Sequence, residues 1–235
     1  MSTDSYERHT QLLPASAVLA PISLLPLVTF RADDAADLIR SIGSLVALGG
    51  VHLIVMRVVR DRGNAIQQRL WASWGGNTTV RMMRWSAGSA ADMRLLRARV
   101  EERTGIKLPS PRAEQRDAVA ADAVYERAAG LLREATRDHE RYPRVWSELK
   151  HYGAARYMLG LRPAALVIAA SVAVLSAGLL WLSIAGTWQT GCWPFLVAGL
   201  FAFVAGLLWA AVVTPEYVRT ASERYSDALL RSAGN

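Results

Sequence analysis

Three long runs of the chain carry no charged side chain, and they limit its possible folds more than any other feature. Residues 11–30, 164–185 and 192–213 contain no Asp, Glu, Lys or Arg. Each run is close to the roughly 20 apolar residues that a helix needs to cross a bilayer. A helix on the surface of a soluble domain would instead carry polar residues along one face. The three runs therefore predict transmembrane helices.

Residues 37–56 predict a further span, although they include Arg40 and His52. Arg40 lies one turn inside the start of this segment, so its guanidinium can extend to the lipid headgroups. We therefore expect an all-α integral membrane protein with four transmembrane helices and a helical cytoplasmic domain inserted between helices two and three. The expected parts are an N-terminal transmembrane hairpin, the basic cytoplasmic domain, a C-terminal transmembrane hairpin and a cytoplasmic tail helix, at residues 1–57, 58–162, 163–214 and 215–235.

The distribution of basic residues predicts the orientation, because cytoplasmic loops of membrane proteins are enriched in Lys and Arg. Residues 57–162 hold 21 Lys and Arg against 12 Asp and Glu, whereas the link at 186–191 has no charge. We expect the basic segment and both termini in the cytoplasm. Such a surface attracts anionic lipid headgroups. A nucleotide, a nucleic acid or a protein partner is the alternative.

Tryptophan is typical of the two membrane–water interfaces, where its ring meets hydrocarbon and its N–H meets water. The interface aromatics expected from their positions are Trp71, Trp74, Trp85, Trp146, Trp181, Trp188, Trp193 and Trp209.

The stretch RLWASWGGNTTVRMMRW, residues 69–85, is the best candidate for a ligand site. Two adjacent glycines end a helix readily, and Asn77 or Thr78 can cap the next one. Free backbone N–H groups at a helix start attract anions, and we expect Arg81 and Arg84 to share one face. The predicted anion or phosphate site comprises Gly75, Gly76, Thr78, Thr79, Arg81 and Arg84. The competing interpretations are a structural corner with its tryptophans at the membrane surface, and a lipid headgroup site.

The rest of the basic segment predicts helices. Ser110 is a good cap and Pro111 suits a first helical position, so we expect a long helix from there to about Tyr142. Pro143 ends that helix, because the residue before a proline leaves the helical region. Residues 144–160 predict a helix that lies in the headgroup plane, or packs on the other cytoplasmic helices, before the third span.

The sequence offers no set of side chains suited to catalysis. His9, His52, His139 and His151 show no metal-binding spacing. Asp138, His139 and Glu140 are consecutive, so on a helix they would point about 100° apart. We therefore expect no enzyme, no metal and no cofactor.

Small residues recur along the two C-terminal spans. Ala198, Ala202, Gly206 and Ala210 repeat every four residues, as do Ala169, Ala173 and Ala177. Small side chains let membrane helices approach closely. The rows predict helix packing, either within one chain or in a homo-oligomer.

Two motifs resemble a family of uncharacterised bacterial inner-membrane proteins. Trp74, Gly75, Gly76 and Thr78 match a Trp-Gly-Gly-x-Thr motif, with Asn77 where proline is expected. Tyr152, Gly153, Leu159, Gly160, Leu161 and Pro163 match a Tyr-Gly…Leu-Gly-Leu…Pro motif before a hydrophobic hairpin. The resemblance implies a multi-pass protein of the bacterial inner membrane and brings no activity with it.

The expected function is that of a non-enzymatic membrane protein, acting as a sensor, scaffold or effector whose basic domain binds an anionic ligand, a lipid headgroup or a protein. The alternative is an oligomeric pore, channel or transporter component. That alternative depends on His52, because ionisable residues inside membrane spans often mark ion or proton pathways.

Overall fold

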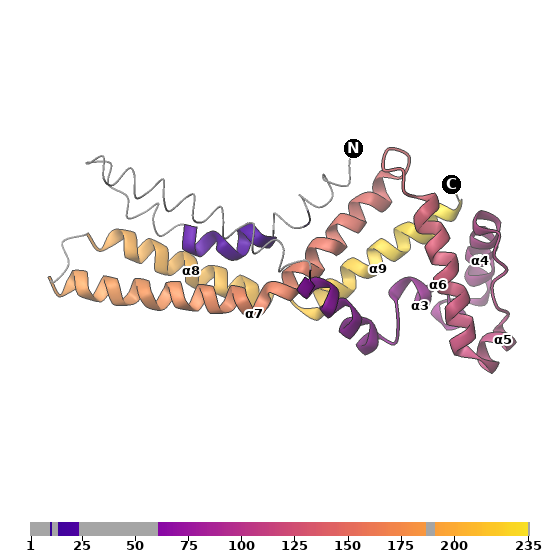
Figure 1. Ribbon diagram of the computed structural model, residues 1–235, viewed down its shortest axis with the longest axis horizontal. Coiled ribbons are helices and arrows are strands. Elements are labelled where there is room, and N and C mark those ends of the chain that lie inside the picture. The colour runs from indigo at the N-terminus through magenta and orange to yellow at the C-terminus, as the bar shows by residue number, and fades with distance from the viewer. Residues whose placement is uncertain (1–9, 11–13, 24–60, 187–190, 235) are drawn as a thin grey trace. The chain divides into compact units, whose positions relative to one another are not determined.

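The computed structural model of the chain describes residues 10, 14–23, 61–186 and 191–234 (Figure 1). Every regular element in these residues is a helix, and none of them forms a strand. The expectation of an all-α fold is therefore confirmed. The chain divides into two compact units. Unit 1 comprises Met1–Ile66 and Ala154–Tyr217, and unit 2 comprises Gln67–Gly153 and Val218–Asn235.

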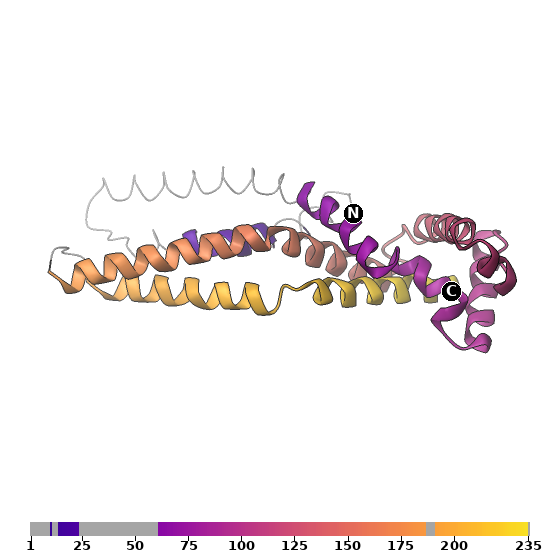
Figure 2. The same ribbon diagram turned by 90° about the horizontal axis from the view of Figure 1, so that it is seen from below.

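Two helices of the described chain, α7 and α8, are long and apolar enough to cross a membrane. Helix α7 spans Pro143–Ile184, and α8 spans Trp193–Ala211. Within unit 1 the two helices lie side by side in both views (Figures 1 and 2). The other two predicted spans lie largely outside the described residues. Pro14–Ser23 forms a shorter apolar helix inside the first, and its flanks and residues 37–56 lie outside the described residues.

Small side chains line the contact between α7 and α8. A Cβ atom added to Gly206 would lie 3.3 Å from the Cβ of Ala169, and one added to Gly199 would lie 3.2 Å from that of Ser176. Ala198 and Ala202, two other members of the small-residue row on α8, are buried. Gly206 and Gly199 therefore lie against α7 of the same chain.

The packing row on α7 differs from the predicted one. Ala169 is buried, but Ala177 is exposed and Ala173 is only partly covered. The most buried positions between Leu161 and Ile184 are instead spaced by four and three residues in alternation: Ala165, Ala169, Val172 and Ser176. An α-helix has 3.6 residues per turn, so a strict row of every fourth residue drifts about 40° per step away from the partner helix. On α8, Ala210 is likewise exposed.

The remaining faces of α7 and α8 are apolar and exposed. Large side chains such as Val174, Leu200 and Phe203 have more than half of their surface open. At the end of this pair opposite the loop, Arg162 donates a hydrogen bond of 2.9 Å from Nη2 to the Ala210 carbonyl. This carbonyl is among the last four of α8, which have no partner within their own helix.

Unit 2 is built from short helices around one core. Its elements are the helical residues 67–74, α3 Thr78–Met83, η1 Trp85–Ala87, α4 Ala90–Thr104, α5 Pro111–Arg116, α6 Ala118–Ala135, residues 143–153 of α7, most of α9 Pro215–Arg231, and η2 Ser232–Gly234. Helix α6 contacts α3, α4 and α5. The largest core side chains are fully buried: Met83, Val100, Tyr125, Leu132, Val218 and Leu229.

The expected long helix from Pro111 to Tyr142 is wrong. Ser110 does cap α5, since its Oγ accepts a hydrogen bond from the Ala113 N–H. The helix breaks at Asp117, which leaves the helical conformation so that its carboxylate accepts from the Ala120 N–H at 2.9 Å and starts α6. Asp is one of the preferred residues for this position. Helix α6 then ends at Ala135, before the predicted end.

Residues 144–160 do not form a separate helix. They are the first part of α7, which continues without a break through Pro163. Proline inside a helix removes one N–H donor, but membrane helices tolerate it where neighbours satisfy the freed groups. The predicted helix in the headgroup plane is therefore replaced by one continuous element.

Gly160 explains part of the second motif. A Cβ atom at Gly160 would lie 3.3 Å from the backbone N of Gly63, and one at Gly63 would lie 2.3 Å from Cδ1 of Tyr157. The helix over residues 61–74 therefore approaches α7 so closely that a Cβ atom at Gly63 would overlap the Tyr157 ring and one at Gly160 would press on the facing backbone. Both glycines belong to unit 1.

Candidate functional site

The Gly-Gly pair makes the corner that the sequence predicts. The helix over residues 61–74 stops there, with Gly75 at φ 77° and Gly76 at φ 120°. The Gly76 N–H donates to the Trp71 carbonyl at 2.8 Å. Both φ values lie in a region that side-chain-bearing residues rarely adopt, which is why glycine is needed at these two positions.

Asn77 caps α3, as predicted, and also links it to α6. Its Oδ1 accepts a hydrogen bond from the Thr79 N–H at 3.0 Å. Its Nδ2 donates to both carboxylate oxygens of Glu126, at 3.0 and 3.3 Å. One side chain therefore satisfies a free N–H of the helix start and fixes the corner against a second helix.

Thr78 and Thr79 turn their hydroxyls inward. The Ser222 hydroxyl on α9 donates to Thr78 Oγ1 at 2.8 Å, and Thr79 Oγ1 lies 2.9 Å from Ser226 Oγ. All four side chains are buried. These two hydroxyls hold α9 on α3 and so are engaged inside unit 2 rather than turned toward a ligand.

Arg84 does not share a helical face with Arg81, contrary to expectation. Helix α3 ends at Met83, and Arg84 follows in an extended conformation. Its guanidinium donates to both carboxylate oxygens of Asp122, from Nε at 2.9 Å and from Nη2 at 2.6 Å. This hydrogen bonding raises the pKa of Arg84 further above its ordinary value. The positive charge of Arg84 is therefore already paired with the carboxylate of Asp122 on α6.

Trp85 contributes to the core of unit 2. Its indole Nε1 donates to the Pro109 carbonyl at 3.1 Å, and its backbone N–H donates to the Glu114 carboxylate at 3.2 Å. The buried guanidinium of Arg97 stacks on its ring. Arg97 also donates to the Met83 carbonyl and to the Tyr125 hydroxyl, both at 2.8 Å. Two hydrogen bonds and the stacked guanidinium therefore hold Trp85 within unit 2.

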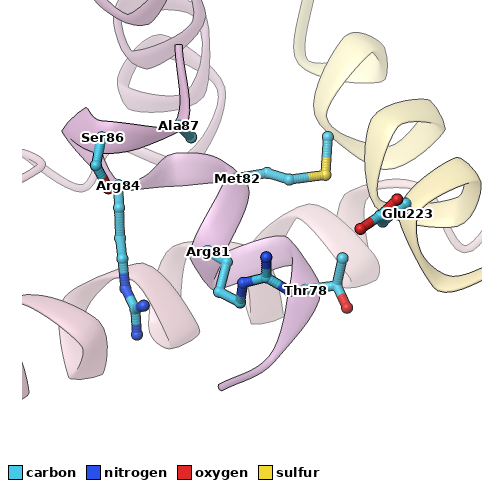
Figure 3. A pocket seen from close by; sticks show the side chains of 7 residues that line it. All are labelled: Thr78, Arg81, Met82, Arg84, Ser86, Ala87 and Glu223. Carbon is cyan, nitrogen blue, oxygen red and sulfur yellow. The ribbon is translucent and has the colours of Figure 1, made fainter. Parts of the chain in front are cut away.

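A pocket of about 320 Å³ opens beside this corner. Figure 3 shows its lining, which comes from α3, the following turn and α9: Thr78, Arg81, Met82, Arg84, Ser86, Ala87 and Glu223. This volume is at the lower end of the range for small-molecule sites, which is roughly 300–1,000 Å³. Of the six residues predicted for the anion site, three line the pocket: Thr78, Arg81 and Arg84.

Arg81 is the pocket-lining arginine with a buried donor atom left without an acceptor among the described residues. Its Nη1 is buried and has no hydrogen-bond partner in the described part of the chain. Leaving a buried N–H donor without an acceptor costs roughly 1–3 kcal/mol or more for a charged group. Such an atom calls for a structural or functional explanation, and the residue that carries it lines the pocket.

The tryptophans predicted for the membrane interface lie in different environments. Trp181 and Trp193, at the ends of α7 and α8, expose 72% and 71% of their surface, whereas Trp209 is buried. Trp71, Trp74 and Trp146 are half-buried, and the Trp146 ring lies 5.7 Å from that of His139. Trp188 and His52 lie outside the described residues. Where the structure is described, no group of His, Cys, Asp or Glu side chains is arranged to hold a metal.

Glu223 and Ser86 were missed by the sequence reasoning. Glu223 is 142 positions from Arg81, and only the docking of α9 on α3 brings it to the pocket. The sequence held one signal for this docking. Ser222 and Ser226 are spaced i, i+4, so they lie on one face of the helix, and that face is otherwise apolar.

Comparison of the chain with protein-family models, with curated proteins and with solved structures finds no match in any of the three.

Proposed function

We propose that this chain is a membrane-anchored, non-enzymatic binding protein that recognises a small anionic ligand in the pocket between α3 and α9. The observation that carries the proposal is Arg81, which lines the pocket and whose buried Nη1 has no hydrogen-bond partner among the described residues. A phosphate or carboxylate oxygen is the natural acceptor for such a donor, and hydrogen bonds of this charged type are among the strongest in proteins.

The anchor is formed by α7 and α8. At a rise of about 1.5 Å per residue, the 19 residues of α8 extend about 28 Å, close to the roughly 30 Å hydrocarbon thickness of a bilayer. The large apolar side chains exposed along both helices would be costly in water. Lipid chains around the hairpin would remove this cost.

The ends of the hairpin support its placement in the membrane. Trp181 and Trp193 are exposed at the end near the connecting loop, where interface aromatics belong. Arg162 lies at the other end, beside the last carbonyls of α8. The basic surplus of residues 57–162 favours the cytoplasm for unit 2. We place the protein in a bacterial inner membrane with both termini inside, and we retain four spans as part of the proposal.

Binding rather than catalysis is supported by the lining of the pocket. Its hydroxyl from Thr78 is engaged by Ser222, and Arg84 is engaged by Asp122. The described lining contains no histidine to act as a general base beside Ser86. The proposed role is therefore that of a sensor or effector, in which occupation of the pocket changes how α9 packs on α3.

The test is a binding titration of the full chain in detergent. Inorganic phosphate and O-phosphoethanolamine are the two probes, and ³¹P NMR measures their binding. Arg81→Gln should weaken binding about tenfold or more, since it removes a charge-assisted hydrogen bond. Arg94→Gln is the matched control, because Arg94 is an exposed arginine of α4 that does not line the pocket. Equal binding by the Arg81 variant, or no binding to the unaltered protein, would refute the proposal.

A further inference from the structure

We infer that the ligand of the α3–α9 pocket carries a positively charged amino group beside its phosphate, as a phosphoethanolamine group does. This inference rests on the proposed function and specifies the chemical class of its ligand. It comes from Glu223, the acidic residue among those that line the pocket. Figure 3 shows this carboxylate on α9, across the pocket from Arg81 and on the opposite side from Arg84.

The Glu223 carboxylate can accept further hydrogen bonds. Its Oε1 accepts a hydrogen bond of 3.1 Å from Nε of Arg219, one turn earlier on the same helix. Both side chains are partly open to solvent, and surface pairs of this kind contribute little to stability. No ion pair joins Glu223 to Arg81 or Arg84 in the described part of unit 2, although all three line one pocket. The carboxylate therefore faces the pocket with a weak, exposed partner.

A simple anion would not suit both walls of this pocket. A phosphate that accepts from Arg81 would bring its negative charge toward Glu223, and like charges placed together work against binding. An ammonium group removes this conflict, because it offers three N–H donors and no acceptor. A ligand with phosphate at one end and ammonium at the other matches Arg81 and Glu223 together, and the carboxylate then selects against plain phosphates.

This chemistry has two sources in a membrane protein. The group occurs on the headgroup of phosphatidylethanolamine and as the soluble compound phosphoethanolamine. The pocket volume of about 320 Å³ admits either form of the group. The chemistry that recognises the group is the same in both cases, so the experiment must separate the two sources.

The first arm compares two soluble probes on the full chain in detergent. O-phosphoethanolamine should bind about tenfold more tightly than sn-glycerol 3-phosphate, which has no amino group, because only the former can donate a charge-assisted hydrogen bond to Glu223. Glu223→Gln should abolish this preference while binding of glycerol 3-phosphate persists. Arg219→Gln is the matched control, since it removes the present partner of Glu223 and leaves the carboxylate in place, so the preference should remain.

The second arm separates the sources of the ligand. In nanodiscs containing phosphatidylethanolamine, soluble O-phosphoethanolamine should compete poorly if the headgroup occupies the pocket. It should bind as it does in phosphatidylcholine nanodiscs if the ligand is soluble.

The results separate the inference from the proposed function. Equal affinity for the two probes, unchanged by Glu223→Gln, would overturn the inference and leave the anion pocket standing. Binding of neither probe, or binding that ignores Arg81→Gln, would overturn both. A preference that survives Glu223→Gln would show that another residue recognises the amino group, and would also overturn the inference.

Discussion

The guanidinium carbon of Arg97 lies 4.5 Å from the centre of the Trp85 ring and 5.2 Å from that of Tyr125. Arg97 is nearly fully buried, and its N–H groups are used by the Met83 and Pro109 carbonyls and the Tyr125 hydroxyl. A buried cation is stable only when paired and hydrogen-bonded. This residue therefore joins the end of α3 and the 105–110 loop to α6.

Replacement of Arg97 by methionine should destabilise unit 2 by roughly 2–4 kcal/mol, because three acceptors inside the protein lose their donor. Thermal unfolding of the full chain in detergent, followed by circular dichroism, measures the change. Arg94→Met is the control on the same helix. Arg94 is exposed, so its replacement should stay within about 0.5 kcal/mol. Similar losses for both variants would refute a special role for Arg97.

Alkaline pH should destabilise the protein through Tyr125. Burial, with the hydrogen bond to Glu114, raises the pKa of Tyr125 from 10.0 to about 12. Between these values the unfolded chain has lost the proton and the folded chain still holds it, so stability falls as pH rises. Below pH 10 the contribution is fully present. The expected loss by pH 12 is roughly 2–3 kcal/mol.

The control for this pH dependence is Tyr125→Phe, which should flatten the stability curve in that window. A residual slope should persist, because burial also raises the pKa of Tyr225. A curve for Tyr125→Phe that runs parallel to that of the unaltered protein would contradict the assignment.

Two glycines of unit 1 should respond oppositely to the same substitution. Gly63→Ala places a Cβ atom 2.3 Å from the Tyr157 ring, so the ring must move and stability should fall by about 1–3 kcal/mol. Gly178→Ala meets no atom within 4 Å, and should be neutral or stabilise by about 0.5–1 kcal/mol through helix propensity. Thermal unfolding of both variants in one detergent tests the close approach. Equal effects would mean that the two helices are not held this closely.

The single cysteine of the chain allows a direct test of orientation. Cys192 is exposed and immediately precedes α8, at the end of the hairpin that we propose to lie outside the cytoplasm. A membrane-impermeant maleimide should label it in intact spheroplasts. In a Cys192→Ser background, Ala123→Cys on the exposed surface of α6 should be labelled only after permeabilisation. The reverse pattern would invert the proposed topology.

Local sequence signals account for much of the fold. Gly75 and Gly76, the Asn77 cap, and the Ser110–Pro111 start of α5 were all predicted, because each depends on the conformation of a few neighbouring residues. The two apolar helices of the hairpin follow from their composition in the same way.

The candidate pocket could not be predicted to the same extent. Arg84 was assigned to a ligand, but Asp122 lies 38 residues away in the sequence and becomes its partner only when α6 packs on α3. Glu223 reaches the pocket through a similar long-range contact. The break at Asp117 was also not predicted. Aspartate can lie within a helix, but here its side chain caps the start of α6. Such choices are decided by tertiary packing, which overrides weak local preference.

Unit 2 is assembled from two segments that the ribosome makes at different times. Residues 67–153 emerge first, and residues 218–235 follow only after the whole apolar hairpin has been synthesised. Until then Thr78 and Thr79 lack Ser222 and Ser226, and the core lacks Val218 and Leu229. Completion of this unit is thus a late event in biosynthesis, and a chain stalled within α8 carries an open core.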